Sequence, residues 1–307
     1  MKCPICHNQE NNSELIAKEM MIGTRDLFQY MACSNCGCLW LQEMPTNIAE
    51  YYPKDYYSFI KKNTSAYEKF AKKEISLSRL NKGSILGKIL KPLYPNYLKW
   101  LNAYCKIDFG SKILDVGTGT GRLLLEMNEF GFLNLTGIDP FIEADINYNK
   151  GVTVYKKSIE HIDERYDFVM LHHSFEHMLE PSSVIKKIKA ILKPNGIALI
   201  RTPLADSYGY ETYGANWVEL DPPRHFFLHT QKSMRLLAAE NELKIDHVMY
   251  DSSSFEIIES EKWKEDIPSS ENGRMYSEKE KKKIDNFVNR LNQTEKGSRA
   301  CFYISHS

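Results

Sequence analysis

Two acids and three glycines in the middle of this 307-residue chain have the types and spacing needed to hold a small ligand. The first acid, Asp115, ends an apolar run, and the glycines follow it two positions apart, at Gly117, Gly119 and Gly121. Glycine tolerates positive φ and lets a ligand approach the backbone closely, and the N–H groups at a helix start attract an anion. The second acid, Asp139, ends the next apolar run. This pattern predicts a ligand site where a strand passes through a tight turn into a helix.

The same turn does not fit a dinucleotide. A dinucleotide-binding loop has the spacing G-x-G-x-x-G, whereas position 122 is Arg and the third glycine comes one residue early. A carboxylate at Asp115 also suits a cationic amino group better than a pyrophosphate. We therefore expect a ligand that carries a positive amino group.

Four cysteines near the N-terminus form two C-x-x-C pairs and indicate a metal site. They are Cys3, Cys6, Cys33 and Cys36. Tetrahedral thiolate coordination suits Zn²⁺, and a bound metal supplies folding energy that a 45-residue unit cannot obtain from its own core. Four protein ligands leave no open coordination position, so we expect a structural zinc site that resembles a zinc ribbon. The alternative is a set of buried free thiols, and we do not assign Cys38 as a ligand.

The elements that must position these residues alternate between strand and helix from Ser111 onward. Apolar, β-prone runs predict strands over 112–116, 134–139, 152–155, 166–171 and 196–202, near 245–250, and over 299–304. Helical spacing predicts helices over 121–130, 181–192 and 230–241, and 259–296 is predicted as a polar insertion with a solvated helix at 277–283. This alternation predicts an α/β fold with a doubly wound, Rossmann-like sheet, which binds ligands at the carboxyl ends of its strands.

Length and composition are typical of a globular protein with one large and one small domain. The formal net charge is zero, 42% of the residues are hydrophobic, and no apolar run reaches transmembrane length. Cysteines in C-x-x-C spacing fit metal ligands better than disulfides, so we expect a cytoplasmic protein without a secretory leader. We divide the chain into a zinc ribbon at 1–45, a helical and loop connector at 46–110, and an α/β domain at 111–307.

Positive charge is concentrated in the connector. Residues 46–110 contain 12 Lys or Arg and 5 Asp or Glu, and the rest of the chain carries the matching negative excess. One interpretation is a solvated helical face. The other is contact with an anionic partner such as a nucleotide diphosphate, a lipid headgroup or RNA.

Three further segments, together with the glycine turn, carry a resemblance to a known family. They are 167–177, 217–227 and the closing strand 301–304. Residues 111–307 resemble class I S-adenosylmethionine (SAM) methyltransferases, in particular bacterial small-molecule enzymes related to the ubiquinone pathway. A zinc ribbon joined to such a domain is similar to enzymes that modify sugars or surface polysaccharides. The resemblance indicates the reaction and gives almost no information about the acceptor.

The resemblance implies a role for each matching residue of the turn. Its three glycines would bring backbone N–H groups to the methionine part of SAM, whose carboxylate the helix start favours and whose amino group Asp115 would face. Asp139 would accept both ribose hydroxyls, because an ionised carboxylate has two acceptor oxygens. Ser158 and Ile159 would border the adenine. His172 or His173, at the end of the fourth strand, would face the methyl donor and the acceptor.

A hydroxyl acceptor would need a group that takes its proton. We predict His225 as this general base, because it lies in the long, proline-stiffened connection 203–229 that can cover the site. His173 is the second candidate, and a histidine that only pins the loop is the alternative to a base at 225. The same connection supplies the residues predicted to line the acceptor pocket, which are Tyr208, Tyr213, Trp217 and Arg224.

A different enzyme class competes at 173–177, where the sequence fits the inverted zinc-protease pattern H-x-x-E-H. That chemistry needs both histidines on one face of a helix, whereas this segment directly follows the predicted strand. A protease would also leave the glycine turn and Asp139 unexplained. We therefore reject the protease and expect His177 to bond into the loop as a structural residue.

These observations predict a SAM-dependent methyltransferase for a small molecule, acting on a hydroxyl of a sugar, a nucleotide-sugar or a polysaccharide precursor that is anionic or glycan-linked. The alternative is an RNA methyltransferase whose ribbon docks on RNA. Neutral net charge disfavours RNA, and the ribbon has three basic residues against five acids. No Asn-Pro-Pro-Tyr-like tetrapeptide for base methylation follows the fourth strand.

Overall fold

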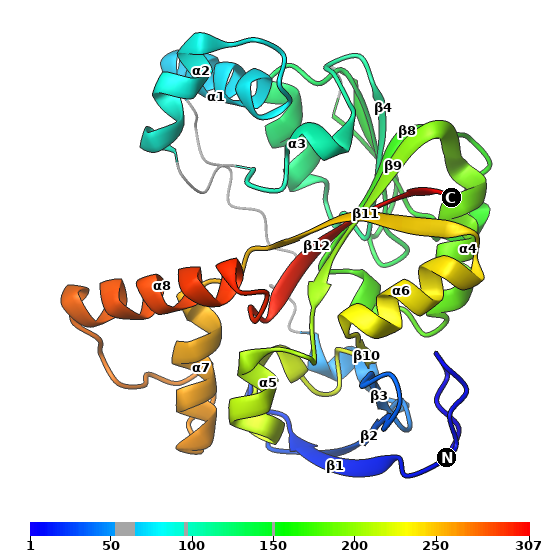
Figure 1. Ribbon diagram of the computed structural model, residues 1–307, viewed down its shortest axis with the longest axis vertical. Coiled ribbons are helices and arrows are strands. Elements are labelled where there is room, and N and C mark those ends of the chain that lie inside the picture. The colour runs from blue at the N-terminus through cyan, green and yellow to red at the C-terminus, as the bar shows by residue number, and fades with distance from the viewer. Residues whose placement is uncertain (53–64, 95–97, 149–150) are drawn as a thin grey trace.

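The computed structural model describes residues 1–52, 65–94, 98–148 and 151–307. An eight-stranded sheet forms the larger part of the molecule, and a four-stranded sheet lies at one end of it (Figure 1). The strand order in the large sheet is β11-β12-β9-β8-β4-β5-β7-β6. Its strands are β4 (Lys112–Val116), β5 (Asn134–Ile138), β6 (Ile146–Asn147), β7 (Val152–Tyr155), β8 (Tyr166–His172), β9 (Leu192–Pro203), β11 (Leu243–Tyr250) and β12 (Arg299–His306).

Strands β4, β5, β7, β8 and β9 are parallel, and both of their faces carry apolar side chains that helices cover. One face packs in a core with α4 (Pro181–Ile191) and α6 (Gln231–Glu240). The other packs with α1 (Ala66–Arg79) and α3 (Arg122–Glu129). β12 and β11 continue the sheet in antiparallel orientation. The predicted doubly wound α/β sheet is therefore confirmed.

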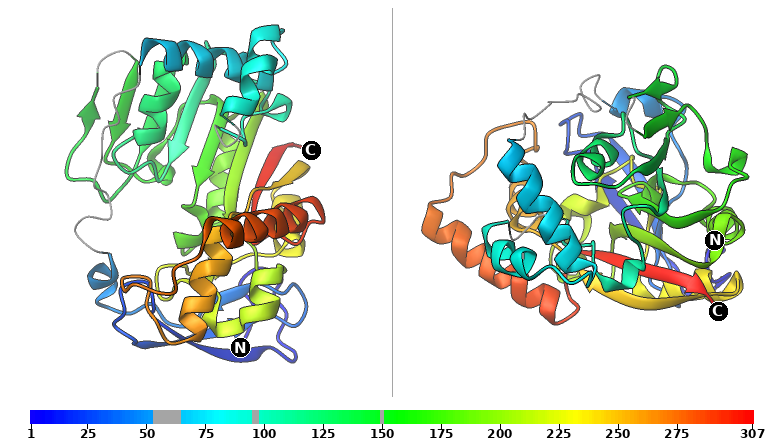
Figure 2. Two further views of the ribbon diagram at one scale, coloured as in Figure 1. Left: turned by 90° about the vertical axis from the view of Figure 1, so that its left-hand side faces the viewer. Right: turned by 90° about the horizontal axis from the view of Figure 1, so that it is seen from above.

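The N-terminal segment forms a small antiparallel sheet that a distant strand completes. β1 (Ser13–Lys18) pairs with β2 (Leu27–Ala32), and β2 pairs with β3 (Leu39–Leu41). The fourth strand, β10 (Phe227–Leu228), comes from the connection between β9 and α6. Segments far apart in the sequence thus share one sheet, at the lower end of the left view in Figure 2.

The long connection 203–229 is a folded segment rather than an open loop. It contains α5 (Tyr208–Tyr213), η6 (Gly214–Asn216), η7 (Val218–Leu220) and β10. Further along the chain, α7 (Ser254–Lys264) packs against α5, and α8 (Glu278–Gln293) packs against α7. A capping box joins Ser277 to Glu280 at the start of α8, so the charged run forms the helix expected there.

A helical hairpin of α1 and α2 (Ile85–Leu90) lies at the end of the molecule opposite the small sheet (Figure 2). Short turns of η2 (Lys91–Leu93) and η3 (Ala103–Cys105) follow it. Part of the basic excess predicted for the connector falls on 53–64, which lies outside the described residues. In the part of the chain that the structure describes, no helix is long and apolar enough to cross a membrane.

Two features of the sheets differ from the sequence prediction. β9 begins at Leu192 rather than at 196, because pairing starts at Tyr166 and Leu192 before the ladder resumes at Phe168 and Ile197. The segment 193–196 is therefore an irregularity within the strand and not a turn before it. The two-residue strands β6 and β10 were not predicted, because strands this short carry no periodic pattern.

Candidate functional site

The glycine turn after β4 lies at the carboxyl edge of the parallel strands, where an α/β sheet binds its ligands. Gly117, Gly119 and Gly121 have φ angles of 74°, 55° and 82°, a region that favours glycine. A Cβ at Gly117 would lie 2.5 Å from Cβ of Ser174, and one at Gly121 would lie 2.7 Å from Cγ2 of Val154. Side chains do not fit at these two positions, because Ser174 and Val154 already occupy the space beside the turn.

Asp115 on β4 and Asp139, directly after the neighbouring strand β5, are both 3% exposed. Asp115 accepts a hydrogen bond from Thr118 Oγ1 at 2.6 Å, and Asp139 accepts one from Gly119 N at 2.9 Å. Burial, with a contribution from the charge of Asp139, raises the pKa of Asp115 to about 7. A positive group beside Asp115 would favour its ionised form. The contacts expected from the resemblance, of Asp115 with the amino group of SAM and of Asp139 with its ribose hydroxyls, stay predictions.

The residues predicted for the adenine and the methyl side lie after two other strands. Ser158 precedes η4 (Ile159–His161), whose first residue is buried and whose last residue has Nδ1 at 3.0 Å from Ser158 Oγ. His172 ends β8, and its ring packs at 4.7 Å from that of Trp100. Burial and the charge of Arg201 lower the pKa of His172 well below its usual range, so this imidazole is neutral. Their contacts with SAM stay predictions.

His173 and Ser174 connect the end of β8 to the glycine turn. His173 has a φ of 51°, and its Nδ1 lies 3.3 Å from Oε1 of the fully buried Glu176. Burial acts to raise the pKa of Glu176, but the bond from His173 and the neighbouring histidines outweigh it and hold the pKa at about 2. Ser174 donates from Oγ to Val116 O at 2.7 Å. This segment is therefore fixed directly against the turn.

His177 and His225 meet with their rings in a T-shaped arrangement, 4.8 Å between centroids. His177 ends η5 (Phe175–His177), and His225 precedes β10. Each ring places Nδ1 2.7 Å from a backbone carbonyl oxygen, that of Arg224 for His177 and that of Glu219 for His225. A carbonyl can only accept, so Nδ1 of both rings carries the proton and Nε2 is the acceptor. The pair can therefore take a proton from a hydroxyl.

Glu176 lies beside the two histidines. One of its carboxylate oxygens is within 4.8 Å of a ring nitrogen of His177 and of one of His225. The expected bond of His177 into the loop is confirmed by its contact with Arg224 O. The sequence reasoning missed that His177 also pairs with His225. The H-x-x-E-H motif could have indicated this contact, because it contains an acid and a base. It does not form a protease site, since η5 is a single turn and not the helix that a zinc protease needs.

The four predicted metal-ligating cysteines converge, with all their sulfur atoms within 4.8 Å of one another. The Sγ–Sγ distance is 3.7 Å for Cys3 and Cys36 and 3.4 Å for Cys6 and Cys33. These distances exceed a disulfide bond and approach the separation of about 3.8 Å expected for thiolates in a tetrahedral zinc site. Cys38 is buried nearby and does not belong to the cluster. The donor set fits structural zinc.

Arg224 joins the N-terminal sheet to the histidine pair. Its side chain is 1% exposed, and its Nη2 lies 2.8 Å from Oε1 of the fully buried Glu19. Its Nε donates to Oδ2 of Asp221 at 3.0 Å, and its Nη1 donates to Tyr51 O at 2.9 Å. The prediction that Arg224 lines an acceptor pocket does not fit this burial. The guanidinium instead holds two parts of the chain together.

The aromatic residues predicted to line the acceptor pocket pack between helices. Trp217 is 0% exposed. Tyr213 donates to Glu261 of α7 at 2.8 Å, and the ring of Tyr208 packs edge-on against Phe287 of α8 at 5.1 Å. These contacts hold α5 against α7 and α8. The burial of Trp217 therefore contradicts its predicted place in a pocket, and the other two aromatics have structural partners.

A group of charged side chains that the sequence did not single out lies at the carboxyl edge, around the ends of β9 and β11 and the start of β12. Arg201 Nε lies 2.7 Å from Asp251 Oδ2, and Arg299 Nε lies 3.6 Å from Glu219 Oε1. Glu256 of α7 is 1% exposed, and neither of its carboxylate oxygens has a hydrogen-bond partner among the described residues. Burial and the charge of Glu219 raise its pKa to about 8, so Glu256 is mostly protonated at neutral pH. These five residues are called the polar wall below.

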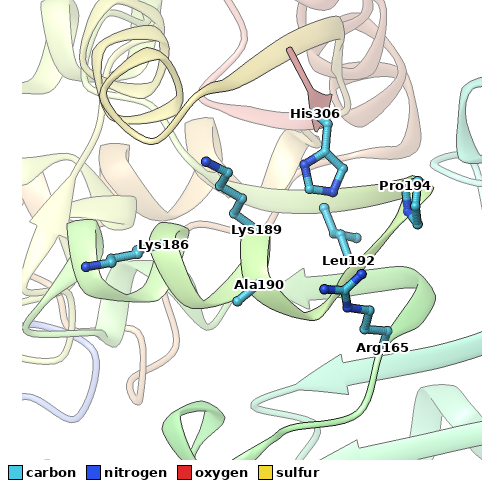
Figure 3. Close-up of a pocket in the computed structure, with 7 residues that line it drawn as sticks. All are labelled: Arg165, Lys186, Lys189, Ala190, Leu192, Pro194 and His306. Carbon is cyan, nitrogen blue, oxygen red and sulfur yellow. The ribbon is translucent and has the colours of Figure 1, made fainter.

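A cavity of about 570 Å³ lies at the amino end of β9, away from the glycine turn (Figure 3). Figure 3 shows Arg165 and His306 pointing toward Leu192 from two sides. Its lining residues are Arg165, Lys186, Lys189, Ala190, Leu192, Pro194 and His306. None of the residues predicted for SAM, metal or acceptor lines this cavity.

Comparison with known proteins identifies the α/β part of the chain. The family described as "Methyltransferase domain" matches residues 86–248, more than half of the chain. The ubiquinone biosynthesis O-methyltransferase of Haemophilus ducreyi is 33% identical over 130 residues, which cover 37% of this chain and 53% of that protein. The enzyme of that name from Paraburkholderia phymatum is 31% identical over 144 residues, which cover 43% of this chain and 61% of that protein. The chain thus matches only about half of these relatives' length.

Solved structures match at lower identity. The cyclopropane synthase MmaA2 from Mycobacterium tuberculosis is 13% identical with a TM-score of 0.42, over 80% of this chain and 99% of that chain. The apo-form of the mycolic acid cyclopropane synthase CmaA1 is 16% identical with a TM-score of 0.43, over 66% of this chain and 84% of that chain. Nothing about the acceptor follows from these two matches.

Proposed function

This chain belongs to the methyltransferase-domain family and is a SAM-dependent methyltransferase, and we propose that it methylates a hydroxyl of a small, sugar-containing acceptor. The acceptor class is a sugar, a nucleotide-sugar or a polysaccharide precursor. The contact of His177 with His225, in a segment that Ser174 fixes against the glycine turn, is the observation that carries this proposal. SAM brings an activated methyl group, so the residues of the chain have two tasks. They orient the acceptor and take its proton.

Contacts through one short segment support a position of the histidine pair beside the methyl donor. Ser174 lies against Gly117, close enough to exclude a side chain there. Two residues on, Glu176 accepts a hydrogen bond at its carbonyl oxygen from Phe226 N at 2.8 Å. This bond ties the loop of His225 to the segment that packs on the turn. One continuous set of contacts therefore links the loop of the proposed base to the glycine turn, where we expect SAM to bind.

The orientation of His225 supports its role as the base. Its Nδ1–H donates to Glu219 O, which leaves Nε2 to accept the hydroxyl proton. Oδ2 of Asp221 lies 3.8 Å from Nε2 and would stabilise the imidazolium that forms. His177 fixes the ring through their T-shaped contact. His173 is the weaker candidate, because its Nδ1 is bonded to Glu176.

The polar wall supports an acceptor rich in hydroxyl groups. Its two arginines pair with two acidic side chains, Asp251 and Glu219, so the formal charges of these four residues balance. A guanidinium can also bind phosphate oxygens in a bidentate manner, which suits a nucleotide-sugar. The wall thus offers both donors and acceptors to one polar ligand.

The alternative function, methylation of RNA with the ribbon as the docking module, has less support. Among the ribbon's three basic residues, Lys18 and Arg25 lie 2.7 Å and 3.6 Å from carboxylate oxygens of Asp266. Their charges are already compensated within the chain, whereas RNA binding needs several free cations along the backbone.

The four ribbon cysteines hold one structural zinc ion in the proposed enzyme. Their sulfur separations and the chemistry of the thiolate set support this assignment. The ion would complete the tetrahedron of Cys3, Cys6, Cys33 and Cys36 and fix the turns that carry them. Because these four ligands fill the coordination sphere, the zinc has no part in the transfer step.

Assays with isotopically labelled SAM, on a nucleotide-sugar panel and on total RNA across a salt series, test the acceptor. We expect a labelled sugar product whose formation changes little with salt, because one small acceptor makes few phosphate contacts. Arg201→Gln should raise KM for the sugar and leave SAM affinity unchanged, whereas Arg235→Gln on the exposed side of α6 is the matched control. Strong, salt-sensitive labelling of RNA with no sugar accepted would overturn the proposal.

A further inference from the structure

Four exposed aliphatic side chains form a continuous stripe on α2 and η2. Ile85, Ile89 and Leu93 are 74%, 67% and 66% exposed, and Leu86 is 42% exposed. Side chains four residues apart lie on one face of a helix, so these four residues, called the α2 stripe below, form one apolar surface. A contiguous apolar patch of this kind indicates a contact surface, unlike a single exposed side chain.

The outward direction of the α2 stripe follows from how α2 packs on α1. Ser84 Oγ caps α2 by accepting from Gly87 N at 2.8 Å, and it donates to the Glu74 carboxylate of α1 at 2.6 Å. A Cβ at Gly87 would lie 1.9 Å from Glu74 O, so α2 touches the backbone of α1 through its glycine. Ile85 and Ile89 are each two positions from Gly87 and therefore point to the opposite side. The stripe is held outward by a defined packing contact.

Positive side chains border the α2 stripe. Residues 65–94 contain seven Lys or Arg and two Asp or Glu. Lys82, Lys88 and Lys91 are exposed, and no ion pair joins them to an acid within the described ranges. One of the two acids, Glu74, is bonded to Ser84 instead. A solvated helical face explains such lysines, but it does not explain the apolar stripe between them.

We propose that the α2 stripe and its three lysines dock on the anionic surface of a lipid bilayer. Aliphatic side chains are stabilised when they leave water for the acyl boundary, while the ammonium groups of lysine stay among the headgroups. RNA would pair with the lysines but offers no apolar layer to isoleucine and leucine, which have no ring to stack on a base. A second copy of the chain in a two-fold interface would bring two positive patches together.

The place of the hairpin in the molecule fits such docking. The α1–α2 hairpin and the small N-terminal sheet lie at opposite ends, as the left view of Figure 2 shows. A bilayer at the α2 stripe would therefore leave the zinc ribbon and the loop of His225 uncovered. Docking of the α2 stripe on a bilayer does not depend on the acceptor proposed above, so the two proposals can be tested separately.

Co-sedimentation of the full chain with phosphatidylcholine vesicles, with and without phosphatidylglycerol, tests this surface. We expect binding only to the vesicles that contain phosphatidylglycerol, and weaker binding as salt increases. Replacement of both Ile85 and Ile89 by Ser should weaken binding at least about tenfold, because two apolar side chains no longer leave water. Lys88→Gln should weaken it about fivefold. Leu133→Ser, at an isolated leucine that is 58% exposed, should leave binding unchanged.

Thermal unfolding of each variant shows whether the hairpin is intact, since all replaced side chains are exposed. The proposal is overturned if the wild-type chain does not bind anionic vesicles, or if the Ile85 and Ile89 variant binds as tightly as the wild type. Concentration-dependent self-association that this variant abolishes, without any vesicle binding, would assign the stripe to a second copy of the chain. Labelled RNA that binds in a lysine-dependent manner while vesicles do not would likewise overturn it.

Discussion

Arg224 and Glu19 form a buried ion pair between residues 205 positions apart, with 2.8 Å between Nη2 and Oε1. Both side chains are almost completely excluded from solvent. Glu19 also accepts backbone N–H bonds from residues 22–24, and Asp221 shares the same guanidinium. The N-terminal sheet is therefore anchored to the segment that carries the proposed base. The anchor is a buried charge network in which the guanidinium and both carboxylates have hydrogen-bond partners.

The same junction includes the backbone of His225. Tyr30 of β2 donates from its hydroxyl to His225 O at 2.8 Å, and β3 pairs with β10 directly after it. Thr230 Oγ1 donates to Cys36 O at 2.6 Å, which links the start of α6 to the cysteine cluster. The position of the proposed base thus depends on the fold of the zinc ribbon.

Removing one partner of the buried pair should destabilise the protein strongly. We expect Glu19→Ala to lower the free energy of unfolding by about 3–5 kcal/mol, because the charge of Arg224 loses a buried partner. Lys18→Ala is the matched control. Its ion pair with Asp266 is exposed, so the denaturation midpoint should barely change. Urea denaturation followed by circular dichroism measures both, and equal midpoints for the two variants would contradict the network.

The cysteine cluster predicts one zinc ion per chain and a clear difference between two neighbouring cysteines. Cys36→Ala removes one of the four ligands and should abolish metal binding, whereas Cys38→Ala should retain it because Cys38 lies outside the cluster. Elemental analysis of freshly purified, reduced protein gives the stoichiometry. Metal retained by the Cys36 variant, or absent from the wild type, would contradict the assignment.

The glycine turn could be predicted from sequence because its determinants are local. Asp115 and the three glycines lie within seven consecutive residues, and their spacing encodes a strand end, a turn and a helix start. The cysteine pairs are equally local, because C-x-x-C spacing places two sulfurs in one turn. Short-range geometry of this kind can be derived from residue types alone.

The surroundings of the proposed base could not be predicted in the same way, because their contacts join distant segments. The partner of Arg224 is Glu19, and no spacing rule connects a β1–β2 turn with a loop after β9. An aromatic-rich loop has the same composition whether it lines a pocket or packs between helices, so the burial of Trp217 was not visible in the sequence. The polar wall could not be predicted for the same reason, because Arg201 and Asp251 meet only in the folded sheet.

Glu256 should give the stability of the protein a specific pH dependence. Its pKa is raised from 4.5 to about 8 in the folded state, so the folded protein keeps a proton that the unfolded chain releases. This contribution to stability is fully present below the unfolded value and is lost as pH rises through the folded one. Glu256→Gln stays neutral throughout, and the stability of the variant relative to the wild type should therefore increase from about pH 5 to about pH 8.5.

Denaturation midpoints across this pH range measure that difference, because titrations of other groups are common to both proteins. Glu278→Gln at an exposed position of α8 is the control and should give no pH-dependent difference. If the difference in midpoint between Glu256→Gln and the wild type does not change with pH, this carboxyl ionises in the folded state as it does in the unfolded chain.

The proposed base should separate catalysis from cofactor binding. We expect His225→Gln to lower kcat by about 10²–10⁴-fold, because the acceptor hydroxyl loses the group that takes its proton. SAM affinity should stay within about twofold in calorimetry, since losses in transition-state interactions need not affect ground-state binding. His177→Gln should have a smaller effect, because His177 orients the ring of His225 without taking the proton. His306→Gln, at the far end of β12, is the matched control. If SAM affinity falls in step with kcat, His225 is a structural residue, and His173 becomes the better candidate for the base.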